Sequence, residues 1–209
     1  MNVGELKQQY PLLKTVVAVS KTHPIERIRE VHALGFSDFG ENKAQELKQK
    51  AGGIDGVTWH FIGHLQTNKA KEVVSVASWI HSVDSIKLLR EIEKQATKLN
   101  KPIHVLMQVN LTGETTKSGL KKEEIDGFLK EAMSCKYATL RGIMVIGPTT
   151  DDQQRIRETF KEAKSIQNGI QKNIPSFQEC SMGMSHDYQI ALEEGATMIR
   201  IGTLIFGER

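Results

Sequence analysis

The residue in this sequence best placed to do chemistry is Lys21, which stands directly after a short β-branched run. Val16–Val19 reads as a buried strand, and Pro24 is suited to open the helix that follows. Because burial disfavours the charged ammonium, an amine at the end of an apolar strand is expected to have a lowered pKa. A neutral amine is a nucleophile toward aldehydes. The alternative is a structural lysine whose stem covers apolar neighbours while its charge reaches water.

A second group of chemistry-bearing residues lies near the C-terminus. Ser181 and Ser185 precede a predicted helix, and Gly202-Thr203 forms a small-residue turn after the last predicted strand. Backbone N–H groups at a helix start favour an anion, and parallel βα barrels often bind phosphate after their last two strands. We therefore expect Ser181, Ser185, Gly202 and Thr203 to hold a phosphate. The alternative is an ordinary helix cap by one of the serines, which needs no ligand.

An amine and a phosphate cradle on one face suggest pyridoxal 5'-phosphate (PLP), whose aldehyde needs an amine and whose phosphate needs such a turn. Arg200 is expected to point from the last strand toward the same face. Placed against the pyridine nitrogen, an arginine would keep that nitrogen unprotonated and make the ring a weaker electron sink. The alternative for Arg200 is a salt bridge to an acidic neighbour such as Glu193.

The elements that would position these residues follow a regular alternation. Apolar runs alternate with amphipathic stretches from Thr15 onward, which is typical of βα units and a parallel sheet. Eight units over 195 residues give about 24 residues each, close to a (β/α)8 TIM barrel. A Gly-rich dinucleotide fingerprint is missing after the first strand, which argues against an open doubly wound sheet. The predicted strands are Val16–Val19, Phe36–Phe39, Thr58–Ile62, Trp79–Val83, Ile103–Val109, Leu140–Ile146, Gln178–Ser181 and Met198–Ile201, the last with a continuation to Phe206.

Polar residues follow the predicted strands, and in a parallel barrel all of them lie at the carboxyl-terminal face, where barrel active sites are built. After Lys21 these are Asn42, His64, Asp84 and Asn110. For the last three, loop hydrogen bonding and helix capping are at least as good an interpretation as ligand contact.

The predicted helices show apolar positions at helical spacing, which indicates core packing. Asp84 or Ser85 can cap one of them, and Asp151 or Asp152 another. Two of these apolar stripes are Leu89, Ile92, Ala96 and Leu99, and Ile125, Phe128, Leu129, Ala132 and Met133.

Composition excludes several classes of protein. The net charge of +3 comes from 28 basic and 25 acidic residues that are interspersed, so no nucleic-acid-binding arm is indicated. Cys135 and Cys180 show neither metal-type nor redox-type spacing, which favours a reducing cytoplasm without a disulfide framework. We find no signal peptide and no membrane-spanning window, and we expect one domain over residues 1–209 and a monomer.

The sequence resembles the PLP-binding proteins of the YggS and PROSC type, the PLP homeostasis proteins. The resemblance extends in order over nearly the whole chain, and only the segment 1–14 is shorter than is usual in the family. The matching blocks are VAVSKT (17–22), FGENKAQE (39–46), WHFIGHLQTNK (59–69), SVDS (82–85), QVN (108–110), TKSGL (116–120), RGIM (141–144), SMGMSHDYQIAL (181–192) and IRIGTLIFGER (199–209).

The resemblance implies a fold similar to the N-terminal barrel of alanine racemase and a Schiff base between PLP and Lys21. It also implies a phosphate site at the serines of 181–185 and at Gly202-Thr203, with Arg200 facing the pyridine nitrogen. The positions that would line the ring are Asn42, Met144 and Met182.

The expected function is to hold PLP in homeostasis without catalytic turnover, with PLP-requiring apoenzymes as the partners such a role would serve. Racemases take their second base from an additional domain, for which this length leaves no room. One alternative is nevertheless a PLP-dependent amino-acid racemase with Lys21 as its base. Another is a barrel enzyme in which Lys21 forms a Schiff base with a phosphorylated substrate.

Overall fold

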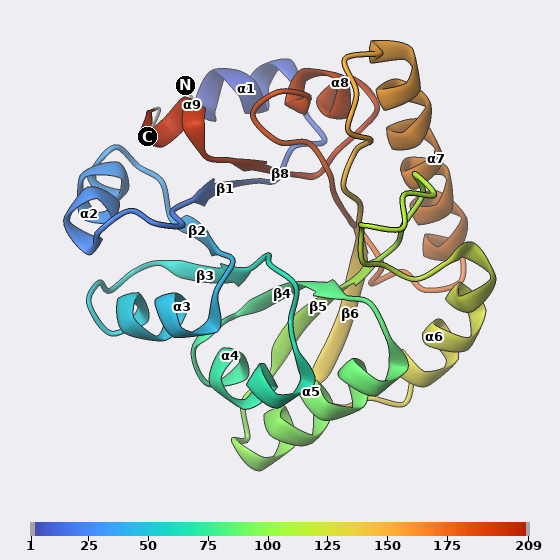
Figure 1. The fold of residues 1–209 in the computed structure, drawn as a ribbon, viewed down its shortest axis with the longest axis horizontal. Helices are drawn as coiled ribbons and strands as arrows, with labels where there is room; N and C mark the ends of the chain where they lie inside the picture. The colour runs from blue at the N-terminus through green and yellow to red at the C-terminus, as the bar shows by residue number, and fades with distance from the viewer. Residues whose placement is uncertain (1–2, 208–209) are drawn as a thin grey trace.

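The computed structural model describes residues 3–207, which form a closed barrel of eight parallel strands (Figure 1). The strands pair in chain order, and the last returns to pair with the first. The predicted (β/α)8 barrel is therefore confirmed, while the ends of the 1–209 prediction lie outside the described residues. The strands are β1 (Thr15–Val19), β2 (Asp38–Glu41), β3 (Thr58–Phe61), β4 (Trp79–Val83), β5 (Ile103–Gln108), β6 (Ala138–Met144), β7 (Glu179–Ser181) and β8 (Met198–Ile201).

Helices surround the strands, as Figure 1 shows in a view along the barrel. Helix α1 lies within the predicted N-terminal extension 1–14, and two 3₁₀ turns, Thr67–Lys69 and Lys122–Glu124, precede α4 and α6. The helices are α1 (Val3–Gln9), α2 (Ile25–Ala33), α3 (Ala44–Ala51), α4 (Ala70–Val76), α5 (Ile86–Lys98), α6 (Ile125–Ala132), α7 (Gln153–Gln171), α8 (Tyr188–Glu193) and α9 (Thr203–Phe206). Among residues 3–207, no helix is both long and apolar enough to span a bilayer.

Local signals begin two of the long helices. The Ser85 hydroxyl accepts from Leu88 N at the start of α5, and the Asp152 carboxylate accepts from two backbone N–H groups at the start of α7. Two residues predicted as core, Leu99 and Met133, are instead 42% and 62% exposed. Each is the C-cap residue that follows its helix, so the buried part of each apolar stripe ends before it.

Strand boundaries differ from the predictions where short polar residues take part in pairing. Strand β2 begins and ends two residues later than predicted, so that it includes Glu41. Strand β6 begins two residues earlier and ends at Met144. The predicted continuation of the last strand to Phe206 is wrong, because the backbone turns at Gly202 (φ −107°, ψ −81°) and starts α9.

The pairing around β1 decides which residues meet at the carboxyl-terminal face. In β1, Val17 is opposite Arg200 of β8, and Val19 is opposite Gly40 of β2. A Cβ on Gly40 would lie 2.8 Å from the Val17 side chain, so this position requires a residue without one. The chain leaving β1 is therefore packed tightly between β2 and β8.

Candidate cofactor-binding site

A cavity of about 570 Å³ opens at the carboxyl ends of β1, β2, β6, β7 and β8, within the size range of small-molecule sites. It brings together Lys21, Arg200 and the turn at Gly202-Thr203, which are far apart in the chain. Its walls are formed by Val19, Lys21, His23, Asn42, Ile62, Met144, Ile146, Met184, Ser185, His186, Arg200, Gly202, Thr203 and Gly207. Seven of the nine predicted site residues are among them.

Lys21 is the second residue after β1 and lines this cavity. The strand itself is buried from Val16 to Val19, but Lys21 is only half-buried, so its amine is less desolvated than the sequence predicts. The next residue, Thr22, has a φ of +69°, a left-handed conformation that non-glycine residues seldom adopt. This turn at Thr22 redirects the chain toward α2 directly after the lysine.

Four side chains, which we call the lysine clamp (Ser20, Glu41, Glu46 and Lys50), hold the backbone on both sides of Lys21. Lys50 Nζ in α3 donates to the Ser20 carbonyl at 2.9 Å, to Glu41 Oε1 at 2.8 Å and to Glu46 Oε1 at 2.6 Å. Glu46 Oε1 also accepts from the Thr22 backbone N–H, and Glu41 Oε1 accepts from Ser20 Oγ at 2.6 Å. The residues before and after Lys21 are thus tied to β2 and α3.

The two carboxylates of the lysine clamp have opposite electrostatic balances. Burial raises the pKa of Glu41 above its usual value, and the bonds from Lys50 and Ser20 offset this only in part. Burial also opposes ionisation of Glu46, but there the bonds from Lys50 and the Thr22 N–H prevail and lower its pKa. Glu41 Oε2 is buried without a hydrogen-bond partner among the described residues, which agrees with its raised pKa.

Arg200 reaches the cavity from β8, and its side chain is buried. Its Nη1 donates to Ser181 Oγ at 2.7 Å, and its Nη2 donates to the Val145 carbonyl at 3.0 Å. Burial lowers the pKa of its guanidinium to about 10, so Arg200 still carries a positive charge at neutral pH. The alternative salt bridge to Glu193 is absent, because Glu193 pairs with Arg157.

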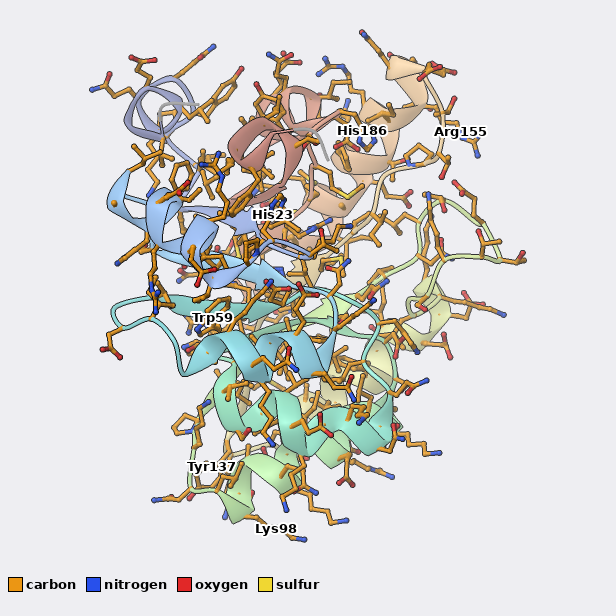
Figure 2. All side chains as sticks on the ribbon, turned by 60° about the vertical axis from the view of Figure 1, so that its left-hand side comes forward. His23, Trp59, Lys98, Tyr137, Arg155 and His186 are labelled. Carbon is orange, nitrogen blue, oxygen red and sulfur yellow. The ribbon has the colours of Figure 1, made fainter. Side chains whose placement is uncertain are left out.

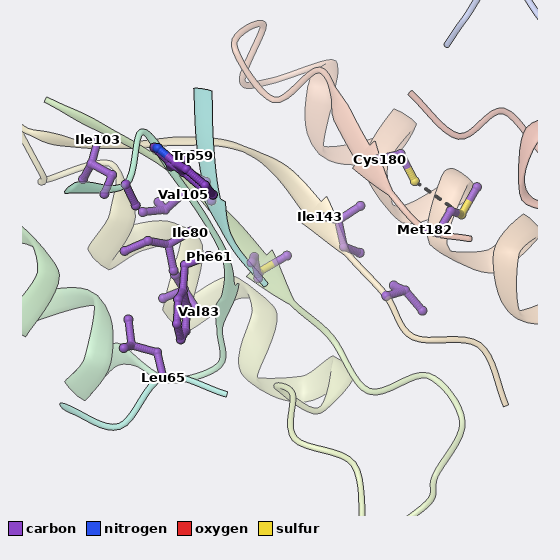
Figure 3. Packing of buried hydrophobic residues seen from close by; sticks show 14 of the residues in the cluster. Trp59, Phe61, Leu65, Ile80, Val83, Ile103, Val105, Ile143, Cys180 and Met182 are labelled. Carbon is purple, nitrogen blue, oxygen red and sulfur yellow. Dashed lines mark hydrogen bonds between the residues drawn. The ribbon is translucent and has the colours of Figure 1, made fainter. Parts of the chain in front are cut away.

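Ser181 and Met182 are the two predicted site residues that do not line the cavity. Ser181 Oγ lies inside the barrel between Arg200 and His81, at 3.0 Å from His81 Nδ1. Met182 packs in the hydrophobic core, where its Sδ accepts from Cys180 Sγ at 3.6 Å (Figure 3). The cause is strand alternation: the end of β7 turns Ser181 toward the barrel axis and its neighbours toward the helices.

The turn predicted to hold phosphate is formed by Ser185, Gly202 and Thr203. Ser185 Oγ accepts from the Gly202 backbone N–H at 3.3 Å, which joins the segment after β7 to the one after β8. The segment after β7 requires Gly183, whose φ is +93° and where a Cβ would lie 2.6 Å from the Ala191 methyl. The two loops thus present hydroxyl and backbone groups side by side to the cavity.

Asn42 and Met144 complete the predicted wall at the ends of β2 and β6. Asn42 Oδ1 is buried and has no hydrogen-bond partner among residues 3–207, as expected of a polar atom that a ligand would satisfy. Two histidines not predicted for the site, His23 and His186, also line the cavity (labelled in Figure 2). The ring of His23 stacks on Phe206 of α9 at 4.6 Å.

The other polar residues at strand ends lie on the same face but outside this cavity. His64 Nδ1 is 3.4 Å from the Asp84 carboxylate, and burial raises the pKa of that carboxyl. Asn110 Nδ2 donates to the carbonyls of Glu114 and Lys117, which closes the loop after β5. These three side chains therefore make polar contacts among the loops of this face.

The sequence-based reasoning missed the residues that support Lys21 and Arg200 from behind. Glu46 and Lys50 stand four residues apart on a predicted helix, a spacing that indicates an ion pair. His60 and His81 each follow an apolar residue inside a short strand, and a polar side chain that is buried there needs a partner. These signals predict buried polar contacts but do not identify the partners.

Known proteins resemble this chain over most of its length. The alanine racemase N-terminal domain family matches residues 1–209. The chain is 39% identical over 197 residues to the pyridoxal phosphate homeostasis protein of Aquifex aeolicus (strain VF5), covering 93% of this chain and 86% of that protein.

Two solved structures of PipY from Synechococcus elongatus PCC7942 share the fold closely. The one without PLP has a TM-score of 0.91 at 36% identity, and the one with PLP bound has 0.89 at 35%, each covering 98% of both chains. Alanine racemase of Clostridium difficile 630 shares the fold alone, with a TM-score of 0.77 at 13% identity over 99% of this chain and 55% of that one. The chain therefore belongs to the pyridoxal phosphate homeostasis proteins, which are built on the alanine racemase N-terminal domain.

Proposed function

We propose that this protein binds PLP at the carboxyl-terminal mouth of its barrel and serves PLP homeostasis by holding the cofactor reversibly, without catalytic turnover. The observation that carries the proposal is one cavity that collects a primary amine, a buried guanidinium and a hydroxyl-lined turn. The PLP-bound structure of PipY, a relative of the same fold at 35% identity, supports the choice of ligand.

The residues in the cavity fit this cofactor. The Asn42 Oδ1 atom in the wall is buried and unpartnered among the described residues, so a polar ligand atom would satisfy it. The wall also holds two basic side chains, Lys21 and Arg200, and Arg200 carries a positive charge that suits an anionic ligand. PLP supplies an aldehyde that condenses with a primary amine, with loss of one water molecule.

The predicted site residues then have distinct roles. Lys21 provides the amine of the Schiff base, and the lysine clamp fixes the backbone that carries it. Ser185, Gly202 and Thr203 hold the phosphate, and Arg200 donates to the pyridine nitrogen. Asn42 and Met144 lie along the ring, whereas Ser181 and Met182 act from behind the wall.

Arg200 suits the site to holding PLP rather than to stabilising a substrate carbanion. A guanidinium can donate hydrogen bonds but cannot accept them. The pyridine nitrogen must therefore accept the bond from Arg200, and it can do so only without a proton of its own. Since an unprotonated ring withdraws electrons less strongly, the site is suited to a reversible covalent bond rather than to stabilising negative charge on a substrate. Release of PLP to apoenzymes that need it is the role we propose for this reversibility.

The direct experiment is a spectrophotometric titration of the apoprotein with PLP. We expect wild type to develop the visible band of a Schiff base, and Lys21→Ala to lose it. Lys43→Ala is the matched control, because Lys43 is an exposed lysine near the same mouth and should leave the band unchanged. An unchanged band in Lys21→Ala would overturn the assignment.

The alternative activity is amino-acid racemisation with Lys21 as the base. Incubating the PLP-loaded protein with L-alanine in deuterium oxide separates the two functions, because a racemase exchanges the Cα proton. We expect no exchange above that of free PLP. Exchange at a useful turnover, lost in Lys21→Ala, would establish the enzyme.

The remaining alternative is a Schiff base between Lys21 and a phosphorylated substrate. Intact mass measurement after borohydride treatment of the protein as purified distinguishes it, since a pyridoxyl adduct excludes a different carbonyl ligand. We further propose one domain over residues 1–209, a monomer without nucleic-acid partners, and a cytoplasmic location. The monomer is tested by light scattering coupled to gel filtration.

A further inference from the structure

A continuous row of hydrogen bonds crosses the barrel interior behind Arg200. We call Asp38, His60, His81, Ser181 and Arg200 the histidine chain. Arg200 Nη1 lies 2.7 Å from Ser181 Oγ, which lies 3.0 Å from His81 Nδ1. His81 Nε2 lies 2.9 Å from His60 Nδ1, and His60 Nε2 lies 3.0 Å from Asp38 Oδ1.

The histidine chain joins the two ends of the barrel. Asp38 is the first residue of β2, at the end opposite the cavity, and its side chain is 27% exposed. His60, His81 and Ser181 are fully buried, and Arg200 lines the cavity. The side chains of the histidine chain follow one another in a row. Among residues 3–207, no group of three or more His, Cys, Asp or Glu residues could hold a metal ion.

The end groups decide the direction of every bond in the histidine chain. Asp38 is a carboxylate that only accepts, so His60 carries its proton on Nε2. Neutral His60 then accepts at Nδ1 from the Nε2–H of His81, and neutral His81 accepts at Nδ1 from the Ser181 hydroxyl. The Ser181 oxygen is left as an acceptor for Arg200, which can only donate.

One added proton would reverse the inner bonds. A charged His60 would donate to His81 Nε2, and His81 would donate from Nδ1 to Ser181, whose own hydroxyl proton would lose its acceptor. Burial lowers the pKa of His81 well below its usual value, with further contributions from His60 and Arg200, so the His81 ring itself disfavours a second proton. The ring of Trp79 stacks on His60 at 5.8 Å and restrains its orientation.

We propose that the histidine chain is a positioning device, in which Asp38 at one end of the barrel fixes the orientation of Arg200 at the other. Ser181 and the Val145 carbonyl anchor the two Nη atoms, so the guanidinium presents a fixed set of N–H groups to the cavity. Asp38, His60 and His81 act only through this contact. The consequence for PLP affinity rests on the proposed function, whereas the orientation of Arg200 does not.

The experiment begins with the apoprotein, where histidine tautomers are read directly from ¹⁵N NMR shifts. We expect His60 and His81 both to carry the proton on Nε2, and the Arg200 Nη protons to exchange slowly. A proton on His81 Nδ1, or charged rings at pH 8, would overturn the proposal. This measurement needs no substitution and no PLP.

Variants at the far end of the barrel test whether the histidine chain transmits. In Asp38→Ala the fixed acceptor is lost, so we expect a population of the His81 Nδ1–H tautomer, faster Arg200 exchange and PLP binding weaker by about three- to tenfold. Asp38→Asn should restore the wild-type pattern, because its amide oxygen can accept from His60. Ser37→Ala is the matched control, since Ser37 donates to Asp38 Oδ2 outside the histidine chain.

The outcomes separate the two proposals. Unchanged His81 tautomer and Arg200 exchange in Asp38→Ala would overturn the positioning role. Changes in both, with no visible Schiff base band in wild type, would support the histidine chain and overturn the proposed function instead.

Discussion

Two largely buried polar networks support the cavity, one beside Lys21 and one behind Arg200, and they are built from different chemistry. The lysine clamp uses charges: Lys50 lies between two carboxylates and holds the backbone beside Lys21. The histidine chain uses neutral rings and a hydroxyl to hold the side chain of Arg200. A reactive amine must keep its own N–H groups free, so it is positioned through its backbone. A guanidinium can be positioned through acceptors, because it has donors to spare.

The largest expected difference between the networks is in stability. Lys50→Met leaves the Glu41 and Glu46 carboxylates without their cation, and breaking a buried ion pair from one side costs about 3–5 kcal/mol. Adding Glu41→Gln to Lys50→Met should recover part of this loss, since the second change removes a buried charge. Urea denaturation of both variants measures the effect. A Lys50→Met variant as stable as wild type would mean that the lysine clamp contributes little.

Removing the neutral Ser181 hydroxyl from the histidine chain should lower the free energy of unfolding by less. Ser181→Ala takes away the acceptor of Arg200 and the donor of His81, and an unsatisfied buried partner costs about 1–3 kcal/mol. Ser82→Ala is the matched control, because the Ser82 hydroxyl is equally buried but has no hydrogen-bond partner among the described residues. Equal losses in the two variants would show that volume, rather than the hydrogen bond, decides.

The networks should also differ in their response to acid. Burial lowers the pKa of His81, whose ring faces His60 and Arg200. Below about pH 6.5 the unfolded chain therefore binds a proton at His81 that the folded chain does not bind. Stability therefore falls as the pH drops through that value, by at most about 1.4 kcal/mol per pH unit for this one proton. In His81→Gln the slope of stability against pH should be shallower. Parallel curves for the variant and wild type, measured by urea melts between pH 5 and 8, would contradict this assignment.

An exposed ion pair provides the smallest expected effect. Arg90 and Glu131 form a two-point contact on the surface, with Arg90 Nε at 2.7 Å from Glu131 Oε1. Because solvent screens such pairs, Arg90→Gln should leave the urea midpoint unchanged within error. A loss comparable to that of Lys50→Met would show that burial is not what distinguishes the lysine clamp.

Much of the fold and part of the site could be predicted from the sequence. The spacing of apolar residues and the turn residues between them predicted eight strands. Because parallel strands place their carboxyl ends together, Lys21, Asn42 and Arg200 line one cavity, as expected. The orientation of single side chains at strand ends could not be predicted, because all three residues of β7 are buried and burial does not separate the barrel axis from the helix layer. The contacts of Ser181 with His81 and Arg200 could therefore not be predicted from the sequence.

The supporting networks depend on pairing between distant residues. Ser181 is 100 residues from its partner His81, and the sequence contains no local signal for that contact. The spacing of Glu46 and Lys50 could have predicted their ion pair. The role of Lys50, however, depends on its contact with the Ser20 carbonyl, 30 residues earlier in the chain. Such contacts arise from strand register, which the sequence pattern leaves open.

We propose that the covalent bond to PLP forms on Lys21. Borohydride reduction of the PLP-loaded protein, followed by peptide mass mapping, tests it most directly. We predict a single pyridoxyl modification on the peptide containing Lys21, absent from Lys21→Ala and retained in Lys43→Ala. Modification of another lysine instead, or none in a protein that still shows the visible band, would show that Lys21 does not hold PLP.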